Sequence, residues 1–256
     1  MAWRSHGTSN AGLVAALAKN GIVTSPLVRG AMAAVDRGHF VRAGTDAYFD
    51  APAPIGCGAT ISAPHMHAHC LELLADKLTP SARVLDVGSG TGILLAYFAA
   101  ACAKAAASAG AGAGADASSA GNGAAPAGFR IFGVEHVDEL AQWSKLNLDS
   151  DPASKDAFAA GAISVATGDG RLGLPGEAPF DVIHVGAAAP SRPDALIAQL
   201  AAGGRLIAPV GSDSQELIAY DKSADGASVR ERVLMGVQYV PLTSLAAQHG
   251  QQTILA

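Results

Sequence analysis

A glycine-rich turn between an apolar run and a helix-like segment is the first place in this sequence where residue spacing points to chemistry. Residues 84–87 (VLDV) lead directly into Gly88-Ser89-Gly90-Thr91-Gly92, and residues 93–98 (ILLAYF) follow with the character of a helix. Glycines let a backbone pass close to a ligand and adopt positive φ, and a helix N-terminus offers free N–H groups. The order of strand, turn and helix therefore predicts a ligand cradle.

Two acidic residues after later apolar runs could complete this cradle. Glu135 follows Gly92 by 43 residues, or by 19 once the 24 residues of 104–127 are left out. That spacing is close to the roughly 20 residues at which an acidic side chain accepts hydrogen bonds from a ribose in nucleotide-binding units. Asp169 lies in a Gly-Asp-Gly sequence after the third run, where its carboxylate could accept from an adenine amino group.

Each of these features also has an ordinary structural explanation. Glycine-rich loops are common, an acidic residue after a strand is often a helix cap, and Gly-Asp-Gly is often a turn. The spacing GxGxG places Ile93 where the dinucleotide fingerprint has its third small residue, which disfavours an NAD site. The joint order of the three features at successive strand ends favours a nucleoside-type cofactor.

The elements that must position these residues alternate along the chain. Five apolar runs are separated by helix-like stretches, namely 84–87, 130–134, 163–166, 181–185 and 205–210. Such alternation predicts a doubly wound, mostly parallel sheet. Two further strand-like runs, 216–220 and 233–240, have no helix-like stretch between them and favour an antiparallel C-terminal hairpin at the sheet edge. The expected fold is α/β with a seven-stranded sheet.

The 256 residues fit a single domain with two functional parts. Residues 1–80 are expected to form an N-terminal helical segment on the substrate side, with one helix ending at Asn20-Gly21 and another beginning at Pro26. Residues 81–256 would form the cofactor-binding core. Residues 104–127 consist almost entirely of Ala, Gly and Ser, and such a composition predicts a flexible, low-complexity surface insertion.

Composition narrows the environment and the partners. The net charge is −5 and no block of Lys or Arg is present, so no nucleic-acid partner is expected. No apolar run is expected to reach the roughly 18 residues of a membrane span, so no membrane partner is expected either. The N-terminus lacks an apolar signal region and the three cysteines show no CxxC spacing, which together predict a reduced, cytoplasmic location.

Six motifs in order resemble the protein-L-isoaspartate (D-aspartate) O-methyltransferase family. The likeness covers nearly the whole chain outside the insertion and the last residues, and its most specific segment is 59–68 (ATISAPHMHA). The other motifs are 86–92 (DVGSGTG), 168–171 (GDGR), 184–190 (HVGAAAP), 203–207 (GGRLI) with 209–211 (PVG), and 235–243 (MGVQYVPLT). The family often has Asp where this chain has Glu135, and the insertion at 104–127 is not typical of it.

The resemblance implies a class I, Rossmann-like methyltransferase that acts as a monomer. It would move a methyl group from S-adenosyl-L-methionine, leaving S-adenosyl-L-homocysteine, to the α-carboxyl of L-isoaspartyl residues or the side-chain carboxyl of D-aspartyl residues in damaged proteins and peptides. The ester would then lead to a succinimide and so to repair. Ser62 matches the active-site serine, and no metal is implied. The positions expected to contact the cofactor are Ala59, Thr60, Ile61, Ser62, His67, Asp86, Gly88, Ser89, Gly90, Thr91, Glu135, His136, Asp169, Gly170, Thr243 and Gln248.

Such a reaction does not require the protein to transfer a proton. A carboxylic acid with an ordinary pKa near 4 is already ionised at neutral pH, so no general base is required. The expected work is alignment of the reacting atoms, with Ser62 orienting the substrate carboxylate by a hydrogen bond.

Other functions have less support in the sequence. His65 and His69 share a helix face, but no nearby Cys or acidic triad completes a metal site. A serine hydrolase is disfavoured because the nucleophile elbow GxSxG is missing. A methyltransferase for a small molecule or a nucleic acid, and a non-catalytic protein that binds the cofactor, both remain open, since fold alone does not fix function.

Overall fold

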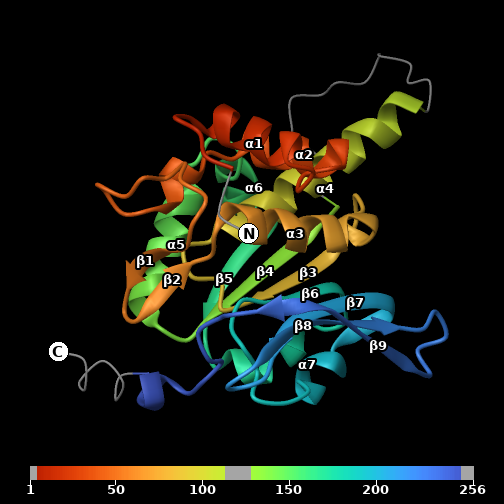
Figure 1. Ribbon diagram of the computed structural model, residues 1–256. Helices are drawn as coiled ribbons and strands as arrows, with labels where there is room; N and C mark the ends of the chain where they lie inside the picture. The colour runs from red at the N-terminus through yellow and green to blue at the C-terminus, as the bar shows by residue number, and fades with distance from the viewer. Residues whose placement is uncertain (1–4, 113–127, 249–256) are drawn as a thin grey trace.

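The computed structural model describes residues 5–112 and 128–248. Their main feature is a seven-stranded sheet in the order β5-β4-β3-β6-β7-β8-β9 (Figure 1). The strands are β3 (Arg83–Val87), β4 (Arg130–Glu135), β5 (Ile163–Thr167), β6 (Phe180–Val185), β7 (Leu200–Val210), β8 (Gln215–Lys222) and β9 (Val229–Val237). The strands from β5 to β7 are parallel, whereas β8 and β9 pair antiparallel. The predicted fold is confirmed, including the C-terminal hairpin.

The central parallel strands β3, β4 and β6 are buried on both faces, as their continuous apolar runs require, whereas the edge strand β5 alternates between buried and exposed residues. Because side chains alternate across a strand, Val84 of β3 packs into a core shared with the helices on one face, while Leu85 packs into a second core on the other. Figure 1 shows α1 (Asn10–Lys19), α2 (Pro26–Ala34), α3 (Pro64–Leu74) and α4 (Ile93–Gly112) over one face of the sheet, and α7 (Asp194–Ile197) on the opposite side.

The N-terminal helices begin and end where the sequence signals predict. The hydroxyls of Ser9 and Ser25 accept hydrogen bonds from the first turns of α1 and α2, and Pro26 is the first residue of α2. Asn20 caps the end of α1, and Gly21 follows in the left-handed region with φ of 71°. The segment also contains a β-hairpin that the sequence did not predict, formed by β1 (Ala53–Gly56) and β2 (Ala59–Ile61).

The remaining helical elements lie between these strands and helices. They are the α-helices α5 (Asp138–Ser150) and α6 (Lys155–Ala159), and the 3-10 helices η1 (Arg37–Phe40), η2 (Ala75–Lys77), η3 (Gly170–Leu172) and η4 (Pro175–Glu177).

The prediction of a flexible insertion at 104–127 is wrong for its first part. Helix α4 continues to Gly112, so residues 104–112 are its last turns, and 113–127 lie outside the described residues. Alanine is the best helix former, and the Lys104 side chain packs so closely on Gly30 of α2 that a methyl group at Gly30 would collide with it. The run of alanines therefore lengthens α4, which already packs against α2.

The expectation that no apolar run reaches the length of a membrane span is also wrong. Among the described residues, Ile93–Gly110 of α4 is long and apolar enough by length and composition, with a mean hydropathy of 1.5. However, 56% of this window is buried inside the protein. The first half of α4 packs between the sheet and α2, which explains its apolar composition without a bilayer.

The winding of the chain reverses at β3, which pairs with β4 on one side and β6 on the other. In open α/β sheets, ligands bind at such a switch point, outside the carboxyl ends of the strands. The turns after β3, β4 and β6 all lie at this carboxyl end of the sheet.

Candidate active site

The glycine-rich turn after β3 has a backbone that only glycine adopts readily. Gly88 has φ of 73°, and a methyl group added there would meet no atom within 4 Å, so its outer side is open. At Gly92, with φ of 85°, a methyl group would lie 2.5 Å from Ser144 Oγ of α5. The turn is therefore open toward the sheet edge and closely packed behind.

Glu135 ties the turn to the end of β4. Its buried carboxylate accepts hydrogen bonds from the backbone N–H of Gly90 at 3.0 Å and of Val137 at 3.0 Å. Each carboxylate oxygen can accept more than one hydrogen bond, so Glu135 retains acceptor capacity for a ligand while it fixes the turn.

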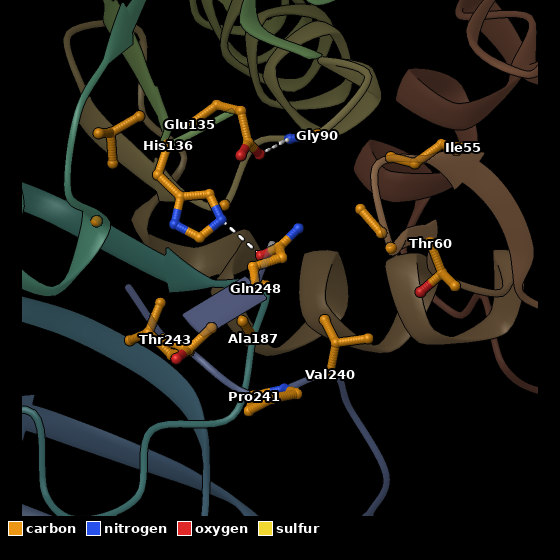
Figure 2. Close-up of a pocket in the computed structure, with 17 residues that line it drawn as sticks. Ile55, Thr60, Gly90, Glu135, His136, Ala187, Val240, Pro241, Thr243 and Gln248 are labelled. Atoms are coloured by element: carbon orange, nitrogen blue, oxygen red, sulfur yellow. Dashed lines mark hydrogen bonds between the residues drawn. The ribbon is translucent and has the colours of Figure 1, made fainter. Parts of the chain in front are cut away.

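A first cavity opens in front of Glu135 (Figure 2). Figure 2 shows the carboxylate turned toward Gly90, and the side chains of His136 and Gln248 turned toward each other. His136 Nε2 donates to Gln248 Oε1 at 2.7 Å, and Gln248 Nε2 donates to the carbonyl of Cys57 at 2.7 Å. The C-terminal segment therefore closes the cavity against the β1–β2 hairpin.

A second cavity adjoins the first across the glycine-rich turn and is more polar. Ser62, His67, Asp86, Ser89 and Thr91 are among the residues that line it. The hydroxyls of Ser89 and Thr91 are buried and have no hydrogen-bond partner within the described part of the chain. Buried hydroxyls without partners are costly, so this cavity fits a ligand that brings polar groups of its own.

Asp86 at the floor of this cavity forms a buried ion pair with His184 of β6. His184 Nδ1 and Asp86 Oδ1 are 2.6 Å apart. Burial disfavours the imidazolium, but the adjacent Cys70 and the hydrogen-bonded Asp86 outweigh it and raise the pKa of His184 to about 10. His184 is therefore a cation at neutral pH and compensates the charge of Asp86.

A groove on the other side of Ser62 is much larger than either cavity. It has a volume of about 1350 Å³, above the roughly 300 to 1,000 Å³ of sites for small molecules. Thr60 and Ser62 line both the groove and the second cavity. Burial raises the pKa of the Tyr239 hydroxyl, which lies near Ser62. The groove can therefore accept a polypeptide segment next to Ser62.

The structure brings nearly all of the sequence-predicted site residues together. Those on the first cavity are Ala59, Thr60, Gly88, Gly90, Glu135, His136, Gly170, Thr243 and Gln248, and those on the second are Thr60, Ile61, Ser62, His67, Asp86, Gly88, Ser89, Gly90 and Thr91. Asp169 lines neither cavity.

Asp169 has a strong partner within the protein. The single N–H of Arg171 Nε is shared between the two carboxylate oxygens of Asp169, at 2.9 and 3.1 Å, and Arg171 Nη2 donates to the same carboxylate at 2.6 Å. Hydrogen bonding to Arg171 lowers the pKa of Asp169. Contact of Asp169 with an adenine stays a prediction.

Other residues on these cavities were not predicted from the sequence. Ile55 and Gly186 line both cavities, and Val240, Pro241 and Leu242 line the first. Gly186 has a packing reason, because a methyl group there would lie 3.1 Å from the carbonyl oxygen of Gly88. The signal for these residues was present in the motifs at 184–190 and 235–243, whereas nothing in the sequence indicated Ile55.

Comparison with known proteins identifies the family. The family model "Protein-L-isoaspartate(D-aspartate) O-methyltransferase (PCMT)" matches residues 8–247. The chain belongs to this family. The resemblance inferred from the sequence motifs is thereby confirmed.

Curated relatives and a solved structure agree with this assignment. The chain is 47% identical over 240 residues to protein-L-isoaspartate O-methyltransferase 1 of Arabidopsis thaliana, covering 93% of each. It is 36% identical over 248 residues to the Caenorhabditis elegans enzyme, covering 97% of this chain and 98% of the other. It also resembles the crystal structure of a putative protein-L-isoaspartate O-methyltransferase from Plasmodium falciparum in complex with S-adenosyl-L-homocysteine, with a TM-score of 0.76, 28% identity, and 93% and 99% coverage. The predicted class I methyltransferase fold is confirmed.

Proposed function

We propose that this chain transfers the methyl group of S-adenosyl-L-methionine to the α-carboxyl of L-isoaspartyl residues, and to the side-chain carboxyl of D-aspartyl residues, in damaged proteins. The methyl ester would then close to a succinimide and so begin repair. The observation that carries this proposal is the position of Ser62, which lies between a polar cavity at the glycine-rich turn and a groove of polypeptide size. Family membership supplies the reaction class.

The two cavities fit the cofactor by their polar atoms. Glu135 offers a carboxylate where a ribose would lie, and the buried hydroxyls of Ser89 and Thr91 offer donors that lack partners within the described residues. Backbone N–H groups of the turn and the start of α4 add further donors. When bound, the cofactor supplies an activated methyl group, and S-adenosyl-L-homocysteine is the product that remains.

The groove supports a polypeptide substrate. Its volume exceeds that of sites for small ligands. Among the described residues that line the groove, only His65 and Asp213 have acidic or basic side chains, so this part of the chain gives it no basic surface of the kind that nucleic acids require. This favours a peptide over a nucleic acid as the methyl acceptor.

The residues of the chain act by position rather than by proton transfer. A carboxylic acid of ordinary pKa is ionised at neutral pH and needs no base. Ser62 donates a hydrogen bond that orients the carboxylate, and the wall formed by Thr60 and Ser62 sets the distance between groove and cavity. Such alignment can supply several kcal/mol of the barrier reduction.

We further propose a monomer in the cytoplasm that needs no metal, nucleic acid or membrane. The three cysteines are all free, which fits a reducing compartment. The net charge of −5 fits a protein that does not bind nucleic acid. Sedimentation of the purified chain would test the monomer.

The experiment that tests the function is transfer of a radioactive methyl group from the cofactor to a synthetic peptide. An isoaspartyl peptide should accept methyl groups, and the same peptide with normal aspartate should not. Equal labelling of both peptides, or of neither, would contradict the proposed function. Labelling of a small molecule or an RNA in place of the isoaspartyl peptide would indicate another class of methyltransferase.

A further inference from the structure

Arg37 is a buried guanidinium beside the proposed cofactor site. It belongs to η1, just after α2, and is 1% exposed. Its Nη1 lies 3.4 Å from Nδ1 of His67, and its Nε is buried with no hydrogen-bond partner within the described part of the chain. Burial lowers the pKa of Arg37 to about 10, against the opposing effects of Tyr97 and Asp50, so it is still a cation at neutral pH.

The position of this cation determines the protonation of His67. A guanidinium donates hydrogen bonds and cannot accept them, so Nδ1 of His67 must be the acceptor and carries no proton. Burial, with Arg37 as the next cause and His184 and His65 as smaller ones, lowers the pKa of His67 well below its usual value. His67 is therefore neutral at pH 7, and its proton is on Nε2.

This tautomer gives His67 one polar group for the second cavity. His67 belongs to α3 and lines the cavity together with Ser62 and Thr91. Since Nδ1 is bound to Arg37, the remaining ring nitrogen, Nε2, can only donate. A donor at this place suits an acceptor with negative charge, and the nearby cation of Arg37 favours such a charge further.

We propose that Arg37 is a positioning residue, which holds His67 in the Nε2-protonated form so that His67 donates to the α-carboxylate of the bound cofactor. The inference rests on the proposed function for the identity of that cofactor. A substrate carboxylate has the same chemistry, but His67 does not line the groove, whereas Ser62 does. His67 would thus bind the carboxylate of the cofactor, and Ser62 would bind the carboxylate of the substrate.

Nitrogen NMR of the histidine side chains tests the tautomer directly. In the wild-type protein without ligand, Nδ1 of His67 should have the shift of an unprotonated nitrogen and Nε2 that of a protonated one. In Arg37→Met the ring should lose this single form and titrate nearer the ordinary pKa. The other ionisable groups next to it are His65, His184 and Tyr97, and Asp86 lines the same cavity. A wild-type His67 protonated on Nδ1 would overturn the proposal, and this measurement needs no variant to fold.

Calorimetry with two ligands tests whether the effect of Arg37 depends on the α-carboxylate of the cofactor. S-Adenosyl-L-homocysteine should bind Arg37→Met about tenfold or more weakly than wild type, as expected for loss of a hydrogen bond to a charged group. The analogue that lacks the α-carboxylate should bind both proteins within about twofold. Equal weakening of both ligands would show that Arg37 acts only through folding, and would overturn the proposal.

Three further variants make this comparison more specific. His67→Phe removes the donor, so Arg37→Met in that background should no longer change the ratio between the two ligands. Arg37→Lys keeps a donor and should restore part of that ratio. Asn10→Leu is the matched control, because Asn10 donates to the carbonyls of Met32 and Val35 in the same segment but does not line the cavity. It should lower stability without changing the ratio.

Kinetics with the peptide substrate distinguish whether His67 binds the carboxylate of the cofactor or that of the substrate. The KM for an isoaspartyl peptide, measured at saturating cofactor, should be the same in wild type and Arg37→Lys. A raised KM for the peptide with an unchanged ligand ratio would assign the hydrogen bond of His67 to the substrate and overturn its assignment to the cofactor. Because the ligand ratio does not depend on methyl transfer, it would stand even if the isoaspartyl assay failed.

Discussion

Gln248 and Cys57 are joined by a hydrogen bond although 191 residues separate them in the sequence. Gln248 Nε2 donates to the Cys57 carbonyl at 2.7 Å, while Gln248 Oε1 accepts from His136. One side chain thus links the C-terminal segment, the β1–β2 hairpin and the end of β4 around the first cavity. Helix propensity cannot hold so short a segment in place, so these hydrogen bonds must contribute to the closure.

Gln248→Ala should therefore weaken binding of S-adenosyl-L-homocysteine by roughly tenfold. The variant loses two hydrogen bonds, each of which contributes about 0.5 to 1.5 kcal/mol. Calorimetry measures the affinity, and Gln142→Ala on the exposed side of α5 is the matched control. Identical affinities for all three proteins would mean that the cavity forms without the C-terminal segment.

Glu135→Ala should weaken the same ligand by roughly ten- to a hundredfold. Hydrogen bonds to a charged acceptor contribute about 1.5 to 3 kcal/mol, and the variant also leaves the N–H groups of Gly90 and Val137 without their acceptor. Glu135→Gln keeps one side-chain oxygen and should lose less affinity than Glu135→Ala. If calorimetry gave wild-type affinity for Glu135→Ala, Glu135 would have no place in the cofactor site.

The ion pair between Asp86 and His184 predicts a pH dependence of stability. The pKa of His184 is raised to about 10 in the folded protein, above roughly 6.5 in an unfolded chain. The stabilisation is thus fully present below about pH 6.5 and is lost as the pH rises through about 10. The free energy of unfolding, measured in urea from pH 6 to 10, should fall more steeply for wild type than for His184→Asn.

The same variant tests the cost of an unpaired buried charge. His184→Asn leaves the carboxylate of Asp86 without its cation, which should cost about 3 to 5 kcal/mol at pH 7. The double variant Asp86→Asn with His184→Asn removes both charges and should recover part of this loss. A double variant less stable than His184→Asn would show that the two charges do not act as a pair.

The sequence predicted the sheet well because its evidence is local. Each of the seven strands contains its own apolar run, and three glycines within five residues indicate the turn after β3. The β1–β2 hairpin gave no such signal, because its four- and three-residue strands are too short for a periodic pattern. Its place is fixed by contacts from outside the hairpin, including the hydrogen bond from Arg42 Nε to the Ile55 carbonyl at 2.7 Å.

Predictions from composition failed where tertiary packing determines the structure. The alanine-rich stretch after Cys102 has the composition of a linker, yet α4 continues through it to Gly112. Likewise, Arg37 in the sequence is one basic residue among many. Only the fold shows that its guanidinium is buried beside His67, because η1 and α3 are separate elements whose contact no sequence pattern encodes.

Removing residues 107–125 should leave activity within about twofold of wild type. This deletion keeps Lys104 against Gly30, and shortening a connection changes the entropy of loop closure only slowly. A second deletion that begins at residue 101 removes the buried Ala101 and Cys102 and should lower the melting temperature. A more than tenfold loss of methyl transfer in the first deletion, with an unchanged melting temperature, would reveal a functional contact in the removed segment.

Ser62→Ala should lower the rate of methyl transfer by roughly ten- to a thousandfold without changing its pH profile. The rate at saturating substrates should be nearly flat from about pH 6 to 8 in both proteins, because the substrate carboxyl is ionised throughout. The surroundings of both buried histidines agree with this, because burial lowers the pKa of His67 well below its usual value and the pKa of His184 is raised to about 10. Initial methyl ester and released methanol must be counted together, since base accelerates ester breakdown. A rate that rises tenfold per pH unit through pH 7, and loses this rise in a His65→Ala or His67→Ala variant, would show that a general base is required and that positioning alone does not explain the catalysis.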